Sequence, residues 1–443
     1  MSLARKSLSV FTRDVLLLLT NIGTSVLIAR LLGPHALGLW VILALIPSYS
    51  EMFARIKVDA AAVYLLGRKE YSMEQIVPAL HIIAVVTSCL VLIPATIFFN
   101  EIGARIFSDD FHKVDNMVVI MLLQIPINFL YLNYMYLHIF REDVTSVNLM
   151  VITRALLGAG LIIVALLGFE LGLFAVVFGS TAGLLAALLI GFFRLGSIRL
   201  DWSGLNLKMF RRLLGYGGQL YIGVAVTNLS TYSTQAIIVA ICAPVLIAYY
   251  SLAQQLAQML NKITDAMGTF LFPRLAKGES KQDSAELAAL AFRVSFAILA
   301  PVAIFAGITI KPAVMLLYGF EYAPLIPVFY MLLPAVLCLA AGSTLMIYFQ
   351  GVGRADLVVK LSFLPMVFQV SLSLILVPDW QIKGGALAFL ISAILALGLQ
   401  VATFLYVTRK KFKRDLLVRR SDLQLVLGFV STIISFPKRK EIS

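Results

Sequence analysis

The chain has 443 residues, of which 60% are hydrophobic and only 13% are charged, and its mean hydropathy is +0.95. Soluble domains average roughly 25% charged residues, so a soluble fold could not hide this much apolar surface. The net charge of +13 would suit a nucleic-acid-binding protein, but the positions of the basic residues indicate a membrane protein instead.

The apolar residues fall into windows that are long enough to cross a bilayer, for which a helix needs about 20 residues. We read the first window as a retained helix rather than a signal peptide, because it reaches Arg30 and further spans follow it. The windows predict twelve transmembrane helices, near residues 14 to 32, 36 to 54, 76 to 98, 117 to 139, 147 to 168, 171 to 193, 213 to 240, 245 to 271, 288 to 310, 325 to 349, 357 to 378 and 384 to 407.

Most of the 36 Lys and Arg residues fall in alternate connections, including both ends of the chain. Basic residues are retained preferentially on the cytoplasmic side of a membrane, so both termini are predicted to be cytoplasmic. The opposite side holds Arg30, Arg105, Lys113, Lys311 and Lys383.

The last connection carries a dense run of basic residues between Arg409 and Arg420. Directly beside a span, this pattern favours an anchor at anionic membrane lipids, and no nucleic-acid partner is expected. The apolar stretch from Leu423 to Phe436 is too short to span; it is either an amphipathic helix on the membrane or a truncated extra span.

The two halves of the chain resemble each other. A shift of 210 residues lays 27–40 over 237–250, and each copy reads as apolar helix, proline and aromatic helix start; a shift of 212 lays Gly172–Ser180 over Gly384–Ser392. Six helices separate the copies, so the halves have the same topology. We predict an N-terminal lobe at 1–195, a cytoplasmic connection at 196–212, a C-terminal lobe at 213–408 and a basic tail at 409–443. The predicted fold is therefore an all-α integral membrane protein with two six-helix lobes, related by a pseudo-two-fold axis along the membrane normal.

Polar residues inside the spans mark a candidate substrate groove. A charged side chain at a helix centre costs about 2.5 to 3.5 kcal/mol on insertion scales, so it should face protein or a wet cavity. The candidates are Asn21, Gln124, Asn128, Arg154, Asn228, Gln235, Gln254, Gln258 and Lys262. Interhelical hydrogen bonds would explain isolated members equally well, and Arg154 lies near enough to the cytoplasmic end to snorkel.

Two acids are candidate proton carriers, Glu51 and Asp265. Each also has a structural explanation, because Glu51 can pair with Arg55 four residues on and Asp265 with Lys262 three residues back. Gly179 and Gly183 have a spacing typical of close helix packing, with no transport role assigned.

Four short motifs occur in order along the chain. They are the stretch from Ile28 to Gly38 that reads IARLLGPHALG, then Phe272–Leu275, Leu317–Pro324 and Gly384–Ala388. Together they resemble the polysaccharide flippases of the multidrug, oligosaccharidyl-lipid and polysaccharide exporter superfamily, which also contains the MATE drug antiporters. The resemblance implies a MATE-like fold in the bacterial inner membrane and monomeric behaviour. No cofactor is expected.

The resemblance also implies a Wzx-like function, which is to move an undecaprenyl-pyrophosphate-linked oligosaccharide from the cytoplasmic to the periplasmic leaflet by alternating access. The polysaccharide polymerase machinery is then a candidate partner. The alternative is a MATE-like drug or cation antiporter, which would prefer an acidic cavity.

An enzyme is the third hypothesis, and we do not favour it. A membrane glycosyltransferase would show a substantial loop with catalytic acids, and the longest outer connection, about 98–116, has no convincing motif. No phosphate-binding loop occurs in the sequence, and no catalytic residue is expected. No metal is expected either, because the four histidines, His35, His81, His112 and His138, are too scattered to form a metal site.

Overall fold

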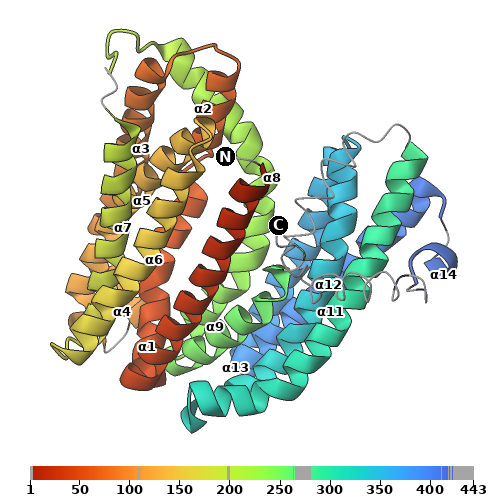
Figure 1. The fold of residues 1–443 in the computed structure, drawn as a ribbon. Coiled ribbons are helices and arrows are strands. Elements are labelled where there is room, and N and C mark those ends of the chain that lie inside the picture. The colour runs from red at the N-terminus through yellow and green to blue at the C-terminus, as the bar shows by residue number, and fades with distance from the viewer. Residues whose placement is uncertain are drawn as a thin grey trace, which may run out of the picture. The chain divides into compact units, whose positions relative to one another are not determined.

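The computed structural model is helical throughout the residues that it describes, which are 3–107, 110–196, 200–262, 264, 281–410, 412–417, 419 and 422 (Figure 1). No strand occurs among them. The helices are α1 (Leu3–Ala54), α2 (Val58–Gly67), α3 (Met73–Ile97), α4 (Phe99–Phe107), α5 (Phe111–Phe140), α6 (Val144–Leu167), α7 (Leu173–Leu195), α8 (Leu207–Ile241), α9 (Pro244–Gln258), α11 (Lys281–Leu317), α12 (Leu325–Gly351), α13 (Ala355–Thr408) and α14 (Phe412–Asp415), with a 3₁₀ turn η2 at Phe320–Tyr322.

Eight helices in the described part of the chain are long and apolar enough to cross a membrane. Two of them, α1 and α13, each break at one residue, Gly33 and Gln381, and so each covers two of the predicted spans. Large apolar side chains also point outward; on α3, Val85, Leu90 and Ile97 are more than half exposed. Such surfaces are stable in lipid rather than in water, so the all-α membrane fold is confirmed.

Two short helices lie where the sequence predicted connections. Helix α2 occupies part of 55–75, and α4 occupies part of 98–116. Helix α2 buries Val58, Ala61, Ala62 and Leu65, a helical stripe that is too short to register as a membrane span. Hydropathy windows detect the lipid-crossing part of a helix, which is why these two helices were missed.

The repeated segments have the same local structure. In the first copy, Gly33 breaks α1 with φ 75° and Pro34 restarts it; in the second, α8 ends at Ile241 and Pro244 begins α9. A left-handed φ favours glycine, and proline suits the first position of a helix. The predicted pattern of helix, turn, proline and helix is therefore confirmed in both copies.

Residue contacts divide the chain into two compact units. Unit 1 is Met1–Asn228 with Ala243–Ala248, and unit 2 is Leu229–Cys242 with Tyr249–Ser443, so α8 contributes to both. The predicted lobes at 1–195 and 213–408 remain a prediction.

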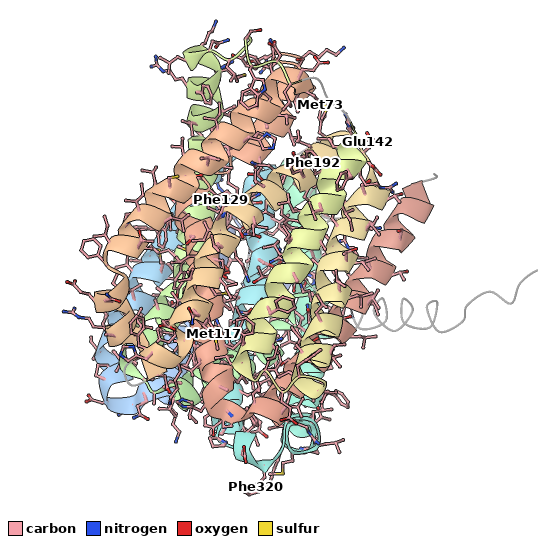
Figure 2. The ribbon with its side chains drawn as sticks, turned by 90° about the vertical axis from the view of Figure 1, so that its left-hand side faces the viewer. Met73, Met117, Phe129, Glu142, Phe192 and Phe320 are labelled. Atoms are coloured by element: carbon pink, nitrogen blue, oxygen red, sulfur yellow. The ribbon has the colours of Figure 1, made fainter. Side chains whose placement is uncertain are left out.

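In unit 1, Met73 at the start of α3 and Glu142 between α5 and α6 lie at one end, whereas Met117 lies toward the other (Figure 2). The connections at this end, between α2 and α3 and between α5 and α6, are among the basic connections that the sequence predicts to be cytoplasmic.

Helices α6 and α7 of unit 1 cross at three glycines, as their spacing predicted for Gly179 and Gly183. A Cβ on Gly183 would lie 2.6 Å from the carbonyl oxygen of Arg154 and 2.9 Å from the Cα of Gly158, both on α6. The backbones are therefore in direct contact, which only small residues permit. This contact also fixes the height and rotation of Arg154 in the bundle.

We expect Gly183→Ala to destabilise the protein by about 1 to 3 kcal/mol, because the added methyl would push α6 away from α7. Thermal unfolding of the detergent-solubilised protein measures the effect. The matched control is Gly160→Ala on α6, where a Cβ meets nothing within 4 Å; it should stabilise the helix by about 0.4 to 1 kcal/mol. Equal effects at the two positions would contradict the close crossing.

Candidate functional site

Unit 1 contains a continuous chain of polar side chains that connects four helices, α1, α2, α5 and α6. It begins with Glu51, Arg55 and Asp59, four residues apart at the end of α1 and the start of α2. The Arg55 guanidinium donates to Glu51 Oε1 at 2.9 Å and also to Asp59 Oδ2. The Arg55 side chain is 7% exposed and that of Asp59 is fully buried, whereas Glu51 is 37% exposed.

Asn128 of α5 connects this ion pair to Arg154 of α6. Its amide nitrogen donates to Glu51 Oε2 at 3.0 Å, and its amide oxygen accepts from Arg154 at 3.5 Å. The Arg154 guanidinium also lies 5.2 Å from the ring centroid of Tyr131, within the range of a cation–π interaction. We call Asp59, Arg55, Glu51, Asn128 and Arg154 the unit-1 polar chain. Its two ends differ, because Asp59 is buried and Arg154 is exposed.

The backbone is strained where the buried end of this polar chain lies. Ile56 and Lys57, which follow Arg55, both have φ of 49°, a conformation that is an outlier for a β-branched residue such as isoleucine. Gly217 of α8 packs against this turn, since a Cβ there would lie 2.5 Å from the Ile56 carbonyl oxygen. Strain of this kind costs of the order of 1 to 3 kcal/mol per residue and is concentrated at functional sites.

Two atoms of the buried pair have no hydrogen-bond partner among the described residues: Arg55 Nε and Asp59 Oδ1. Buried polar groups are nearly always satisfied in proteins, so an unsatisfied pair indicates a site that is not optimised for stability alone. The arrangement offers carboxylates that can exchange a proton and an exposed guanidinium that can bind an anion.

A third arginine lies in the same region of unit 1. Arg13 of α1 donates to Asn148 of α6 at 3.0 Å, and Asn148 in turn donates to Ser9 of α1 at 2.8 Å. Both Arg13 and Arg154 interact electrostatically with Tyr131. Sequence reasoning missed Arg13, which was counted as a cytoplasmic charge, and Asp59, which was placed in a connection. The signal that could have found Asp59 is the spacing of four between Glu51, Arg55 and Asp59.

The structure brings three predicted residues together in unit 1: Glu51, Asn128 and Arg154. Gln124 is on the same helix as Asn128, but its amide donates to two hydroxyl groups of α7, Ser180 at 3.3 Å and Thr181 at 2.6 Å. Asn21 is exposed on α1. The local Glu51–Arg55 ion pair, which the sequence left as an alternative to a site, is present and is part of the polar chain.

The remaining predicted residues belong to unit 2, except Asn228, which belongs to unit 1. Gln235 of α8 donates to Ser251 of α9 at 3.3 Å. Gln254 is buried and Gln258 half-buried on α9, and Lys262 is exposed beyond its end. The Asn228 side chain and Asp265 lie outside what the structure describes, so the pairing of Lys262 with Asp265 stays a prediction. The described residues contain no cluster of His, Cys, Asp and Glu able to hold a metal ion.

A family model described as polysaccharide biosynthesis protein matches residues 27–327, more than half of the chain. The chain belongs to this family. The match includes every member of the unit-1 polar chain and the first three of the four sequence motifs, so the sequence resemblance to polysaccharide flippases is confirmed. A search among curated proteins finds no match.

Solved structures of the same fold are membrane transporters. The lipid II flippase MurJ, in an inward closed conformation, is 12% identical with a TM-score of 0.78, and the match covers 98% of this chain and 94% of MurJ. An inward-facing MATE multidrug transporter is 12% identical with a TM-score of 0.74, and the match covers 89% of this chain and 96% of that transporter. A MOP superfamily transporter from Pyrococcus furiosus is 13% identical with a TM-score of 0.59, and the match covers 92% of this chain and 96% of that transporter. Its binding pocket is described as having reversed polarity. This family member therefore has the MATE-like fold that the sequence predicted.

We expect Asp59→Asn to destabilise this family member by about 3 to 5 kcal/mol, because the change removes one charge of a buried ion pair. Thermal unfolding in detergent measures it. The control is Glu70→Gln, since Glu70 pairs with Arg68 and Arg212 at the exposed end of unit 1; its cost should stay below about 1 kcal/mol. A cost for Asp59→Asn no larger than the control's would contradict the buried ion pair.

Proposed function

We propose that this protein is a flippase that moves an undecaprenyl-pyrophosphate-linked oligosaccharide from the cytoplasmic to the periplasmic leaflet of the bacterial inner membrane by alternating access. The observation that carries the proposal is the exposed Arg154 at the end of the unit-1 polar chain. It adds a cation and hydrogen-bonding groups to a fold shared with a lipid II flippase and to a chain of the polysaccharide biosynthesis family.

The chemistry of the substrate explains why these groups are needed. A buried hydroxyl without a hydrogen bond costs on the order of a few kcal/mol, and an unpaired pyrophosphate charge costs far more. Arg154 and Arg13 together offer two guanidinium groups for phosphate oxygens, and Asn128 and Asn148 offer amides for sugar hydroxyls. The hydrocarbon tail of the substrate stays in lipid throughout.

Several parts of this proposal rest on the sequence. The orientation with both termini cytoplasmic follows from the basic connections, and delivery to a polysaccharide polymerase and monomeric behaviour follow from the family resemblance. Glu51 supports proton coupling, because it is half-buried and bonded to both Arg55 and Asn128. Protonation of Glu51 would weaken both bonds and change the environment of Arg154.

A MATE-like antiporter is the second candidate function. Glu51, Asp59 and Asp14 lie in the same part of unit 1, and carboxylates would suit a cationic drug. The accompanying Arg13, Arg55 and Arg154 oppose this, because they make the region mixed rather than acidic. Deleting the gene separates the candidates: a flippase mutant accumulates lipid-linked repeat units in the inner leaflet, whereas normal surface polysaccharide with new drug sensitivity indicates an antiporter.

We expect Arg154→Ala to reduce transport at least about tenfold, since a hydrogen bond to a charged group contributes about 1.5 to 3 kcal/mol. Complementation of the deletion strain, read as surface polysaccharide per unit of protein in the membrane, measures the loss. Arg154→Lys keeps the charge and should restore part of it. The control is Arg354→Ala, an exposed arginine that pairs with Asp356 outside the spans; equal loss at both positions would contradict the proposed site.

We expect Glu51→Gln to abolish the acceleration of transport by a pH gradient, because the amide cannot carry a proton but can still hydrogen-bond Asn128. Transport into reconstituted vesicles, with and without an imposed gradient, provides the measurement. If the variant responds to the gradient as fully as the native protein, Glu51 is not the proton carrier.

A further inference from the structure

Arg293 holds described residues that follow α13 against α11. Arg293 of α11 donates to Asp422 Oδ2 at 2.8 Å and to the Asp415 carbonyl oxygen at 2.6 Å. Asp422 also accepts the Arg419 backbone N–H at 2.9 Å. The Arg293 and Asp422 side chains are only 10% and 2% exposed. One guanidinium therefore holds both Asp415 and Asp422 against α11.

An apolar contact supports this ion pair. Leu416 is 2% exposed and belongs to a core cluster with Ala288 and Phe292 of α11 and Phe404 of α13. Figure 1 shows α14, which ends next to Leu416, beside α11. A basic segment that was merely attracted to the membrane would need neither a buried side chain nor a buried ion pair, since buried charges are costly unless they are held in place.

The rest of the segment presents a different surface. Phe412 and Leu417 are each 48% exposed, and Arg409, Arg414 and Arg419 are exposed as well. Between Arg409 and Arg420 the sequence has seven basic residues and one acidic residue, RKKFKRDLLVRR. Exposed apolar side chains among basic ones are what an interfacial membrane anchor requires.

We propose that Arg409, Phe412, Arg414, Leu417 and Arg419 form a membrane anchor that binds anionic phospholipid headgroups. The Arg293–Asp422 ion pair, which we call the clip, holds this anchor against α11. Two observations favour lipid as the partner. The segment directly follows a membrane-spanning helix, which places it at headgroup level, and its strong positive charge is complementary to anionic lipid. The proposal is independent of the transported substrate.

The clip persists at physiological pH. Burial alone would raise the pKa of Asp422, but the hydrogen bonds from Arg293 and the Arg419 amide outweigh it and hold that pKa below its usual value. A carboxyl with a lowered pKa in the folded state contributes stability that is lost only as pH falls through that lowered value. Asp422 is therefore ionised, and the clip closed, under cellular conditions.

Hydrogen–deuterium exchange of the full chain in lipid nanodiscs tests the anchor. Peptides from 409–422 should exchange several-fold more slowly in discs of phosphatidylcholine with phosphatidylglycerol than in discs of phosphatidylcholine alone. Arg414→Glu should remove that difference. The matched control Arg354→Glu changes the net charge equally at another exposed arginine and should leave the difference intact.

The clip itself is tested with Asp422→Asn, which has nearly the same shape but no charge. We expect exchange in 409–422 to speed up on the order of tenfold in both lipid mixtures, because local opening no longer breaks an ion pair. The exchange of α12 reports whether the variant is folded. Equal native exchange in the two kinds of disc, which would assign this surface to a protein partner or a second copy, overturns the proposal, as does an unchanged rate in Asp422→Asn.

Discussion

Hydrocarbon offers a charged side chain no hydrogen-bond partner, so every charge within a membrane-spanning helix must be satisfied by the protein or by a cavity. This constraint explains the organisation of unit 1. Arg55 and Asp59 form an ion pair in the buried interior, and Glu51 and Asn128 extend the contacts to α5 and α6. At the end of the polar chain opposite Asp59, Arg154 is exposed.

The packing of small residues makes this arrangement possible. The backbone contact of α6 with α7 at Gly158 and Gly183 lies beside the Arg154 carbonyl, so the helix that carries the exposed guanidinium is held rigidly. At the other end, Gly217 lets α8 approach the strained turn at Ile56 and Lys57. Because α8 contributes residues to both compact units, the buried end of the polar chain is in contact with the helix that joins them.

Much of this fold could be predicted from the sequence, because span length and the distribution of basic residues are set by the bilayer and not by particular contacts. The breaks at Gly33 and Pro244 and the crossing at Gly183 were readable for a different reason. Glycine permits positive φ and close backbone contact, and proline fixes φ. Helix α2 was missed because its short apolar stripe resembles a connection by hydropathy. The role of Arg13 was missed because the sequence does not show whether a basic residue near a terminus faces lipid headgroups or bonds to another side chain. Arg13 bonds to Asn148.

Which polar residues come together depends on helix rotation, and the sequence gives rotation only within one helix. Gln124 and Asn128 are one turn apart on α5, yet Gln124 bonds to α7 while Asn128 bonds to Glu51 and Arg154.

In the proposed function, the unit-1 polar chain binds the charged head of a lipid-linked sugar. Native mass spectrometry of the purified protein with undecaprenyl-pyrophosphate-linked oligosaccharide tests it most directly: Arg154→Gln should weaken binding at least about tenfold, a loss of about 1.4 kcal/mol or more, while Arg354→Gln should not. Equal affinity of Arg154→Gln and the native protein would contradict it.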